Sequence, residues 1–178
     1  QRPQVARHSV SSSHLSGYPW GKVWKTALFQ KIHFPQGYWF EDTLVWMILE
    51  PLCKRKVTTD KLSLRYRINP NSISHLAHTC PKSIDSLYVT LQLLKDRDEL
   101  EIKFDQQQYD NLLRQMRINF YRVVGLSLEI KQAVFALEQD LITKKFAGWT
   151  TFDSRIKPIE EFLRSGDYYN FELWCKWH

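Results

Sequence analysis

An acidic pair, Glu41-Asp42, is the part of this sequence best suited to chemistry. Apolar residues with helical spacing follow at once, so Asp42 is predicted to start a helix, where the helix dipole favours a negative charge. A carboxylate held in this way can act as a general base that removes a proton from a hydroxyl group. The same pair is also a common helix start signal, which contributes only about 1 kcal/mol to the helix. The residues around the pair decide between these interpretations.

Aromatic, cationic and hydroxyl side chains lie on both sides of the acidic pair. Trp20 could stack on a sugar face and Lys22 could meet a phosphate or an acceptor oxygen, while Trp39 beside the pair could form a wall of an acceptor pocket. Downstream, Arg67 offers a planar donor fork for phosphate, and Ser72 adds a hydroxyl. Each has a structural alternative. Trp20 could be a packing anchor, Arg67 a solvated strand end and Ser72 the cap of a turn.

These blocks, in this order, resemble the second half of inverting glycosyltransferases of family 2. The matching elements are Trp20-Gly-Lys22, Phe34-Pro-Gln-Gly37, Glu41-Asp42 and the segment Tyr66–Ser74, so the resemblance covers roughly residues 17–75. It implies a GT-A fold, a nucleotide-sugar donor and a sugar or polyol acceptor. It also implies that Asp42 is the base, that Glu41 orients a group or the acceptor, and that Arg67 contacts the donor diphosphate. A divalent metal, Mn or Mg, would act in the complete enzyme.

The nucleotide-binding half of that family, with its Asp-x-Asp metal motif, has no counterpart here. Asp96-Arg-Asp98 has the spacing, but it follows the proposed base in a charged stretch that is predicted to be a solvated helix face. We therefore expect the acceptor-side, carboxyl-terminal part of such an enzyme, inactive by itself. Loss of a covering half would expose apolar surface near residues 23–52, so we also expect a homo-oligomer.

The composition limits the binding partners and the cellular compartment that we expect for this chain. The chain has 178 residues and a net charge of +6, which favours anionic partners such as nucleotide phosphates or a membrane surface. We find no nucleic-acid-binding signature and expect no nucleic acid partner. The three Cys have no CxxC spacing, which argues against a zinc site. An odd number of Cys fits a reducing compartment, so we expect a cytoplasmic protein, either free or at the inner face of the membrane.

The periodicity predicts an α+β fold that is predominantly helical. The expected division is a flexible lead-in over residues 1–16, a glycosyltransferase-like segment over 17–78 and an all-helical segment over 79–178. Strands are expected at 57–59 and 62–68, joined by a turn or forming one bent strand. Helices are expected at 24–31, 42–53, 84–94, 105–145 with a break at Gly125, 156–164 and 167–177.

A second class of function stays open. The aromatic, basic tail from Trp149 to His178 could be the working surface of a non-catalytic helical module that docks a protein partner or a membrane. Trp46, one turn into the helix after Asp42, is predicted to be a core residue in either case.

Overall fold

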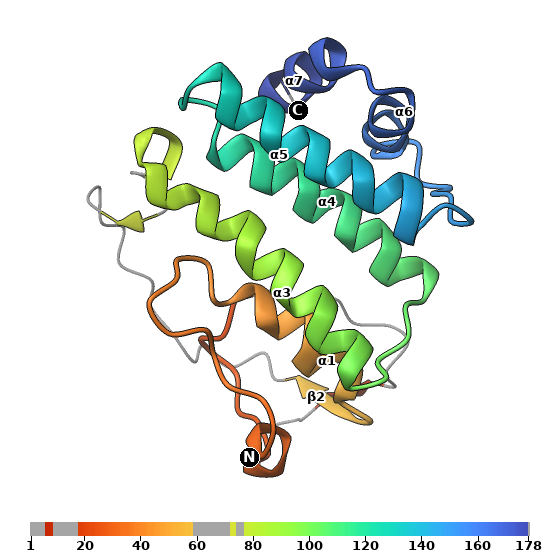
Figure 1. The fold of residues 1–178 in the computed structure, drawn as a ribbon. Helices are drawn as coiled ribbons and strands as arrows, with labels where there is room; N and C mark the ends of the chain where they lie inside the picture. Colours follow the sequence, from red (N-terminus) through yellow and green to blue (C-terminus); the bar gives the residue numbers. More distant parts are fainter. Residues whose placement is uncertain (1–5, 9–17, 59–71, 74–76, 178) are drawn as a thin grey trace.

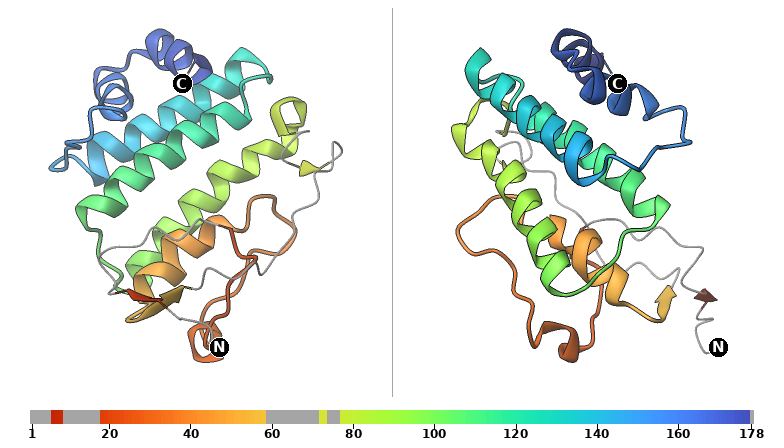
Figure 2. Two further views of the ribbon diagram at one scale, coloured as in Figure 1. Left: turned by 180° about the vertical axis from the view of Figure 1, so that it is seen from behind. Right: turned by 45° about the vertical axis from the view of Figure 1, so that its right-hand side comes forward.

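The computed structural model describes residues 6–8, 18–58, 72–73 and 77–177, and it is predominantly helical, as predicted (Figure 1). Three long helices run roughly alongside one another, with two shorter helices next to them on one side and the segment 18–58 on the other side (Figure 2). The long helices are α3 (Asp85–Glu99), α4 (Gln106–Arg122) and α5 (Leu128–Asp140), and the short ones are α6 (Lys157–Ser165) and α7 (Tyr168–Trp177).

Helix α4 is the centre of this arrangement, because it packs against α3, α5, α6 and α7. Its sequence explains the position: apolar residues recur every three or four positions and make one continuous stripe. Five of them are fully buried, namely Tyr109, Leu112, Leu113, Met116 and Phe120.

The ends of these helices follow local signals. Asp105 caps α4, since its side chain accepts a hydrogen bond of 2.8 Å from the Gln108 amide. The predicted helix over 105–145 divides into α4 and α5 around Gly125, as the sequence suggested. Pro158 lies in the first turn of α6, and Gly166 ends this helix with a φ of 74°.

The segment before α3 contains a short 3-10 helix at Thr26–Phe29 and a longer helical stretch that begins at Thr43. The latter is a π-helix over Val45–Leu49 that continues as the short α1 (Glu50–Leu52). Its apolar residues pack on α3, and Pro51 precedes its end as predicted. One hydrophobic cluster contains residues of this stretch and of all five later helices, so the predicted segments 17–78 and 79–178 share a core.

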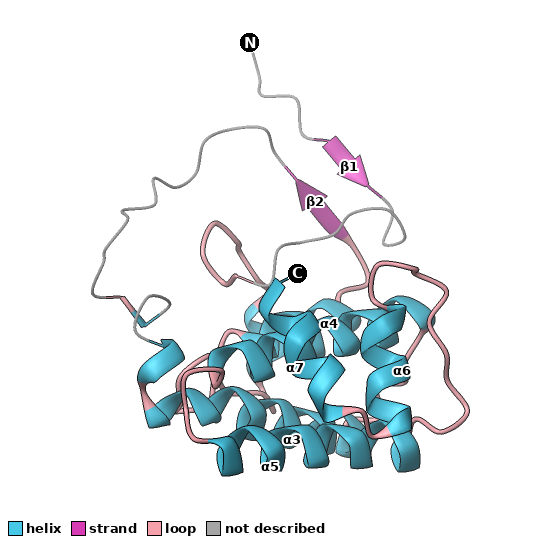
Figure 3. Cartoon of the chain, turned by 90° about the horizontal axis from the view of Figure 1, so that it is seen from above, coloured by secondary structure: helices cyan, strands magenta, loops and turns pink. Residues whose placement is uncertain are grey.

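The β structure differs from the expectation. Strand β2 (Lys56–Thr58) pairs antiparallel with β1 (Ala6–His8), in the register Arg7↔Val57 (Figure 3). The partner of β2 therefore comes from the lead-in that was expected to be flexible, where backbone groups of residues 6–8 are satisfied by ladder hydrogen bonds. The second strand predicted at 62–68 lies outside the described residues. Among the described helices, none is long and apolar enough to cross a bilayer.

Candidate functional site

A cleft of about 310 Å³ separates the helical stretch that follows Asp42 from helix α4. One wall carries Asp42, Trp46 and Glu50, which are four residues apart and therefore share a helix face. The opposite wall carries a stripe of α4. The full lining is Tyr18, Asp42, Thr43, Trp46, Glu50, Asn111, Arg114, Gln115, Ile118 and Arg122. The cleft thus combines carboxylates, guanidinium groups, amides and two aromatic rings.

Asp42 lies in the turn that precedes the helix, and its backbone carbonyl accepts the Val45 amide at 2.9 Å. Burial raises the pKa of the Asp42 carboxyl, Arg122 lowers it and Glu41 raises it. The backbone N–H groups of Asp42 and Thr43 favour the charged form as well. The net result is a pKa above the ordinary value, so Asp42 is a stronger base than an exposed aspartate.

Arg122 is the cation that acts on this carboxylate. Its guanidinium carbon lies 3.5 Å from the centre of the Phe40 ring, and its Nη1 donates a hydrogen bond of 2.6 Å to the Ser86 hydroxyl. Burial lowers the Arg122 pKa to about 10, and the charges of Asp42 and Tyr18 oppose this shift. Arg122 therefore keeps its positive charge at neutral pH.

Trp46 lines the cleft instead of belonging wholly to the core as predicted. Its indole N–H donates to the Gln115 side-chain oxygen at 3.3 Å, and the Gln115 amide donates to Asn119 at 2.8 Å. The indole is thereby fixed at the cleft wall. A periodic apolar stripe could not predict this position, because it depends on where α4 packs.

The other predicted site residues lie near the cleft without lining it. Trp20 stacks on Tyr18 at 4.6 Å, and the Lys22 ammonium donates to the Tyr18 carbonyl. The Lys22 pKa is lowered by burial, an effect that Glu50 opposes. The backbone amide of Trp39 donates to Asp85 at 2.9 Å. Tyr18 and Trp46 therefore take the place in the cleft that was expected for Trp20 and Trp39.

Three further residues were predicted for the site, and the two of them that the structure describes are not among those that line the cleft. Glu41 is half-buried beside Asp42, and its carbonyl accepts the Leu44 amide at 3.2 Å. Ser72 is half-buried and does not line the cleft. Arg67 lies outside the described residues.

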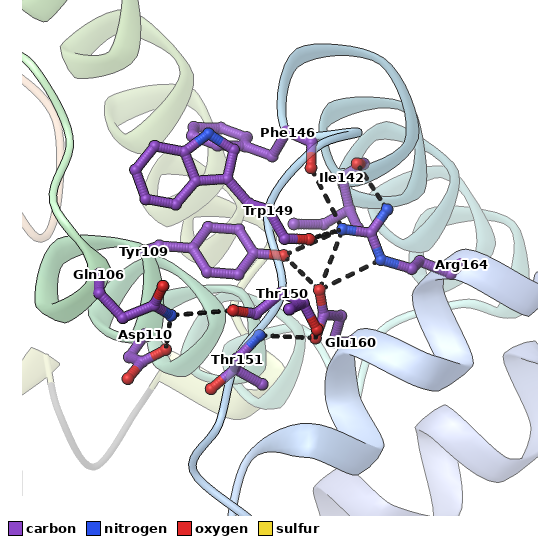
Figure 4. Close-up of polar contacts among 10 residues, drawn as sticks. All are labelled: Gln106, Tyr109, Asp110, Ile142, Phe146, Trp149, Thr150, Thr151, Glu160 and Arg164. Atoms are coloured by element: carbon purple, nitrogen blue, oxygen red, sulfur yellow. Dashed lines mark hydrogen bonds and ion pairs between the residues drawn. The ribbon is translucent and has the colours of Figure 1, made fainter.

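A second cluster of charged groups ties α4 to α6, and its chemistry is internal (Figure 4). Glu160 is buried and accepts hydrogen bonds from the Tyr109 hydroxyl at 2.7 Å and the Thr151 amide at 2.9 Å. Arg164 pairs with Glu160 at 3.0 Å and donates to the carbonyl of Trp149 at 2.5 Å. Because both carboxylate oxygens of Glu160 are occupied, we interpret the cluster as a structural clamp.

The Asp96-Arg-Asp98 motif is not a simple solvated face. Arg97 is fully buried in the core and donates to the carbonyls of Met47 and Lys103, at 2.5 and 2.8 Å. Its guanidinium also stacks on Phe104 at 3.9 Å. Asp98 instead pairs with Lys145 near the surface. Within the described part of the chain, no group of three or more His, Cys, Asp or Glu is placed to hold a metal ion.

No protein-family model, curated protein or solved structure matches this chain. The interpretation of the cleft therefore depends on its residues and their geometry.

Proposed function

We propose that this chain supplies the acceptor side of a glycosyltransferase of the GT-A type, with Asp42 as the general base. The donor would be a nucleotide-sugar, and the acceptor a sugar or polyol hydroxyl. The observation that carries the proposal is the position of Asp42 in a polar cleft, partly desolvated and close to Arg122. The resemblance of residues 17–75 to family-2 enzymes supports the same role for Asp42.

The reaction assigns a clear task to this carboxylate. The acceptor oxygen attacks the anomeric carbon and forms a new C–O bond, while the bond from that carbon to the diphosphate breaks and the leaving group takes the electron pair. Asp42 takes the hydroxyl proton as the bond forms. The described residues contain no carboxylate cluster for the divalent ion that the resemblance implies, so no step is assigned to a metal.

The lining of the cleft suits a carbohydrate. The aromatic rings of Trp46 and Tyr18 offer apolar faces for sugar C–H groups. The side-chain amide of Asn111 offers hydrogen bonds to hydroxyls, whereas the amide of Gln115 already bonds Trp46 and Asn119. A carboxylate beside them completes a set of groups that can both accept from and donate to a polyol.

The first test measures binding to this chain with a panel of neutral mono- and disaccharides. We expect saturable NMR shifts of the Trp46 indole N–H and the Gln115 side-chain amide. The indole of Trp177, which is 78% exposed on α7, serves as the control and should not shift. Sugars that shift neither cleft signal, or that shift Trp177 equally, would refute a carbohydrate site in the cleft.

The second test uses turnover in a protein that joins this chain to a nucleotide-binding half. Asp42→Asn should preserve the fold and reduce turnover by a factor on the order of 10²–10⁴, the usual contribution of a general base. Near-normal turnover of this variant would remove Asp42 from the mechanism. The 178-residue chain by itself is expected to show no transfer from any nucleotide-sugar.

The second candidate, a non-catalytic docking module, is favoured by the outer face of α7. Tyr169, Leu173 and Trp177 are spaced four residues apart and are 73%, 44% and 78% exposed. The partner would be a protein or a membrane surface. Under this proposal, Trp177→Ser abolishes the function of the protein and Asp42→Asn leaves it intact, whereas a glycosyltransferase shows the opposite pattern.

A further inference from the structure

Helix α4 brings a cation to the candidate base from far outside the segment that resembles a glycosyltransferase. Asp42 belongs to that segment, which ends near residue 75, whereas Arg122 is the last residue of α4. Both side chains line the same cleft. Arg122 therefore brings a charge from the helical second part of the chain to the cleft that Asp42 lines.

Arg122 is held in place from two sides. Its guanidinium carbon packs 3.5 Å from the centre of the Phe40 ring, two residues before Asp42 in the same turn. Phe40 has a φ of 65°, a left-handed conformation that is unfavourable for a bulky residue and persists only where its surroundings fix it. The stacked guanidinium is one of the contacts that fix it.

The other side of Arg122 is anchored in a buried polar network. Ser86 Oγ accepts the Arg122 Nη1 hydrogen bond at 2.6 Å and donates its own proton to Asn119 Oδ1 at 2.6 Å. Ser86 and Asn119 are both almost fully buried, at 0% and 1% exposure. Since Asn119 also accepts from Gln115, one buried amide supports two groups of the cleft wall.

We propose that Arg122 is a positioning residue for Asp42: it fixes the turn that carries this carboxylate and supplies the positive charge near it. The inference rests on the proposed function only for the role of Asp42 as a base. The positioning itself is a property of the resting protein and can be measured without turnover.

The other charged groups around the cleft do not replace Arg122. Arg114, the second cleft arginine, is paired with Asp153 at 2.6 Å. Glu41 opposes ionisation of Asp42 from the same turn, and Glu50 adds another acidic group to the cleft. Burial and Glu41 would thus favour a protonated Asp42, which cannot accept a proton. Arg122 opposes both effects, and it keeps a larger share of Asp42 in the reactive carboxylate form.

The test is an NMR titration of the Asp42 carboxyl carbon in the purified 178-residue chain. Arg122→Gln should shift the Asp42 pKa upward, because the favourable charge is lost. Arg122→Lys should restore most of the wild-type value, since a positive charge returns. Arg114→Gln is the matched control and should leave the Asp42 pKa unchanged. An unchanged Asp42 pKa in Arg122→Gln, or an equal shift in Arg114→Gln, would overturn the proposal.

A reciprocal measurement covers the case in which Arg122→Gln does not fold. The Arg122 side-chain N–H signal is followed in Asp42→Asn, with Glu41→Gln as the control. We expect a changed chemical shift of this signal in Asp42→Asn only, because the nearby negative charge is lost. No change in Asp42→Asn, or the same change in the control, contradicts the proposal. Loss of turnover in Asp42→Asn is recorded separately, so a failure of the proposed base and a failure of the positioning role are distinguishable.

Discussion

A buried carboxyl on α5 gives the sharpest prediction about stability. Glu138 is fully buried, and its Oε1 accepts a hydrogen bond of 3.3 Å from the Asn119 side-chain amide. Within the described part of the chain, its Oε2 has no hydrogen-bond partner. Burial raises the pKa of Glu138 well above its ordinary value, so the native protein keeps this carboxyl protonated to a higher pH than it would an exposed glutamate.

The consequence for stability has a definite sign. In the unfolded chain a glutamate ionises near pH 4.3, whereas native Glu138 keeps its proton to higher pH. The native state therefore binds more protons, and the free energy of unfolding falls by about 1.4 kcal/mol for each pH unit above the unfolded pKa. This loss stops once the pH exceeds the native pKa of Glu138.

The perturbation is Glu138→Gln, which has the same shape and cannot ionise. The free energy of unfolding of this variant, relative to wild type, should rise by about 1.4 kcal/mol per pH unit between the unfolded and native pKa values of Glu138. The unpaired amide N–H groups of the new Gln add a penalty that does not change with pH, so they do not affect this slope. Urea unfolding followed by tryptophan fluorescence, from about pH 4.5 to about pH 8, measures the difference.

A matched control comes from the same helix. Glu129→Gln alters an exposed carboxyl in the first turn of α5 and should show no such upward trend. A stability difference between Glu138→Gln and wild type that is constant with pH would show that Glu138 is ionised in the native state. The reasoning from burial would then be refuted.

Two further predictions concern a close backbone approach and a buried ion pair. Gly125→Ala should destabilise the fold by roughly 1–3 kcal/mol, because the added Cβ would lie 2.2 Å from the His78 carbonyl oxygen. Gly148→Ala is the neutral control, since a Cβ there would have nothing within 4 Å. Equal melting temperatures for the two variants in thermal unfolding would contradict the close approach. Arg164→Ala should lower the free energy of unfolding by about 3 kcal/mol, since it leaves the buried Glu160 without its cation. The loss of stability relative to wild type should be smaller in an Arg164→Ala, Glu160→Gln double variant. A double variant no more stable than the single one would show that Arg164 acts through its carbonyl contacts instead.

The helices were predictable because their signals are local. Apolar spacing indicated α3, α4 and α6, Asp105 marked the start of α4, and a break at Gly125 separated α4 from α5. The start of the helix after Asp42 was equally local. These features depend on residues within a few positions of one another, where periodicity and capping act directly.

The strand pairing was less accessible to such reasoning. The residues around β2 have β propensity, yet propensity cannot say which distant segment completes the ladder. The partner proved to be Ala6–His8, in a polar, Ser-rich lead-in that has no strong strand pattern.

The sequence by itself determined that Asp42 stands at a helix start and that the chain is mostly helical. Only the tertiary structure decided what surrounds that carboxylate. Arg122 and Gln115 come from a helix far along the chain, and Trp46 faces the cleft because α4 packs across it. Arg97 and Glu138 likewise look like surface charges in the sequence, but packing buries both. Burial and long-range charge depend on distances that close only when the helices assemble, so no local pattern encodes them.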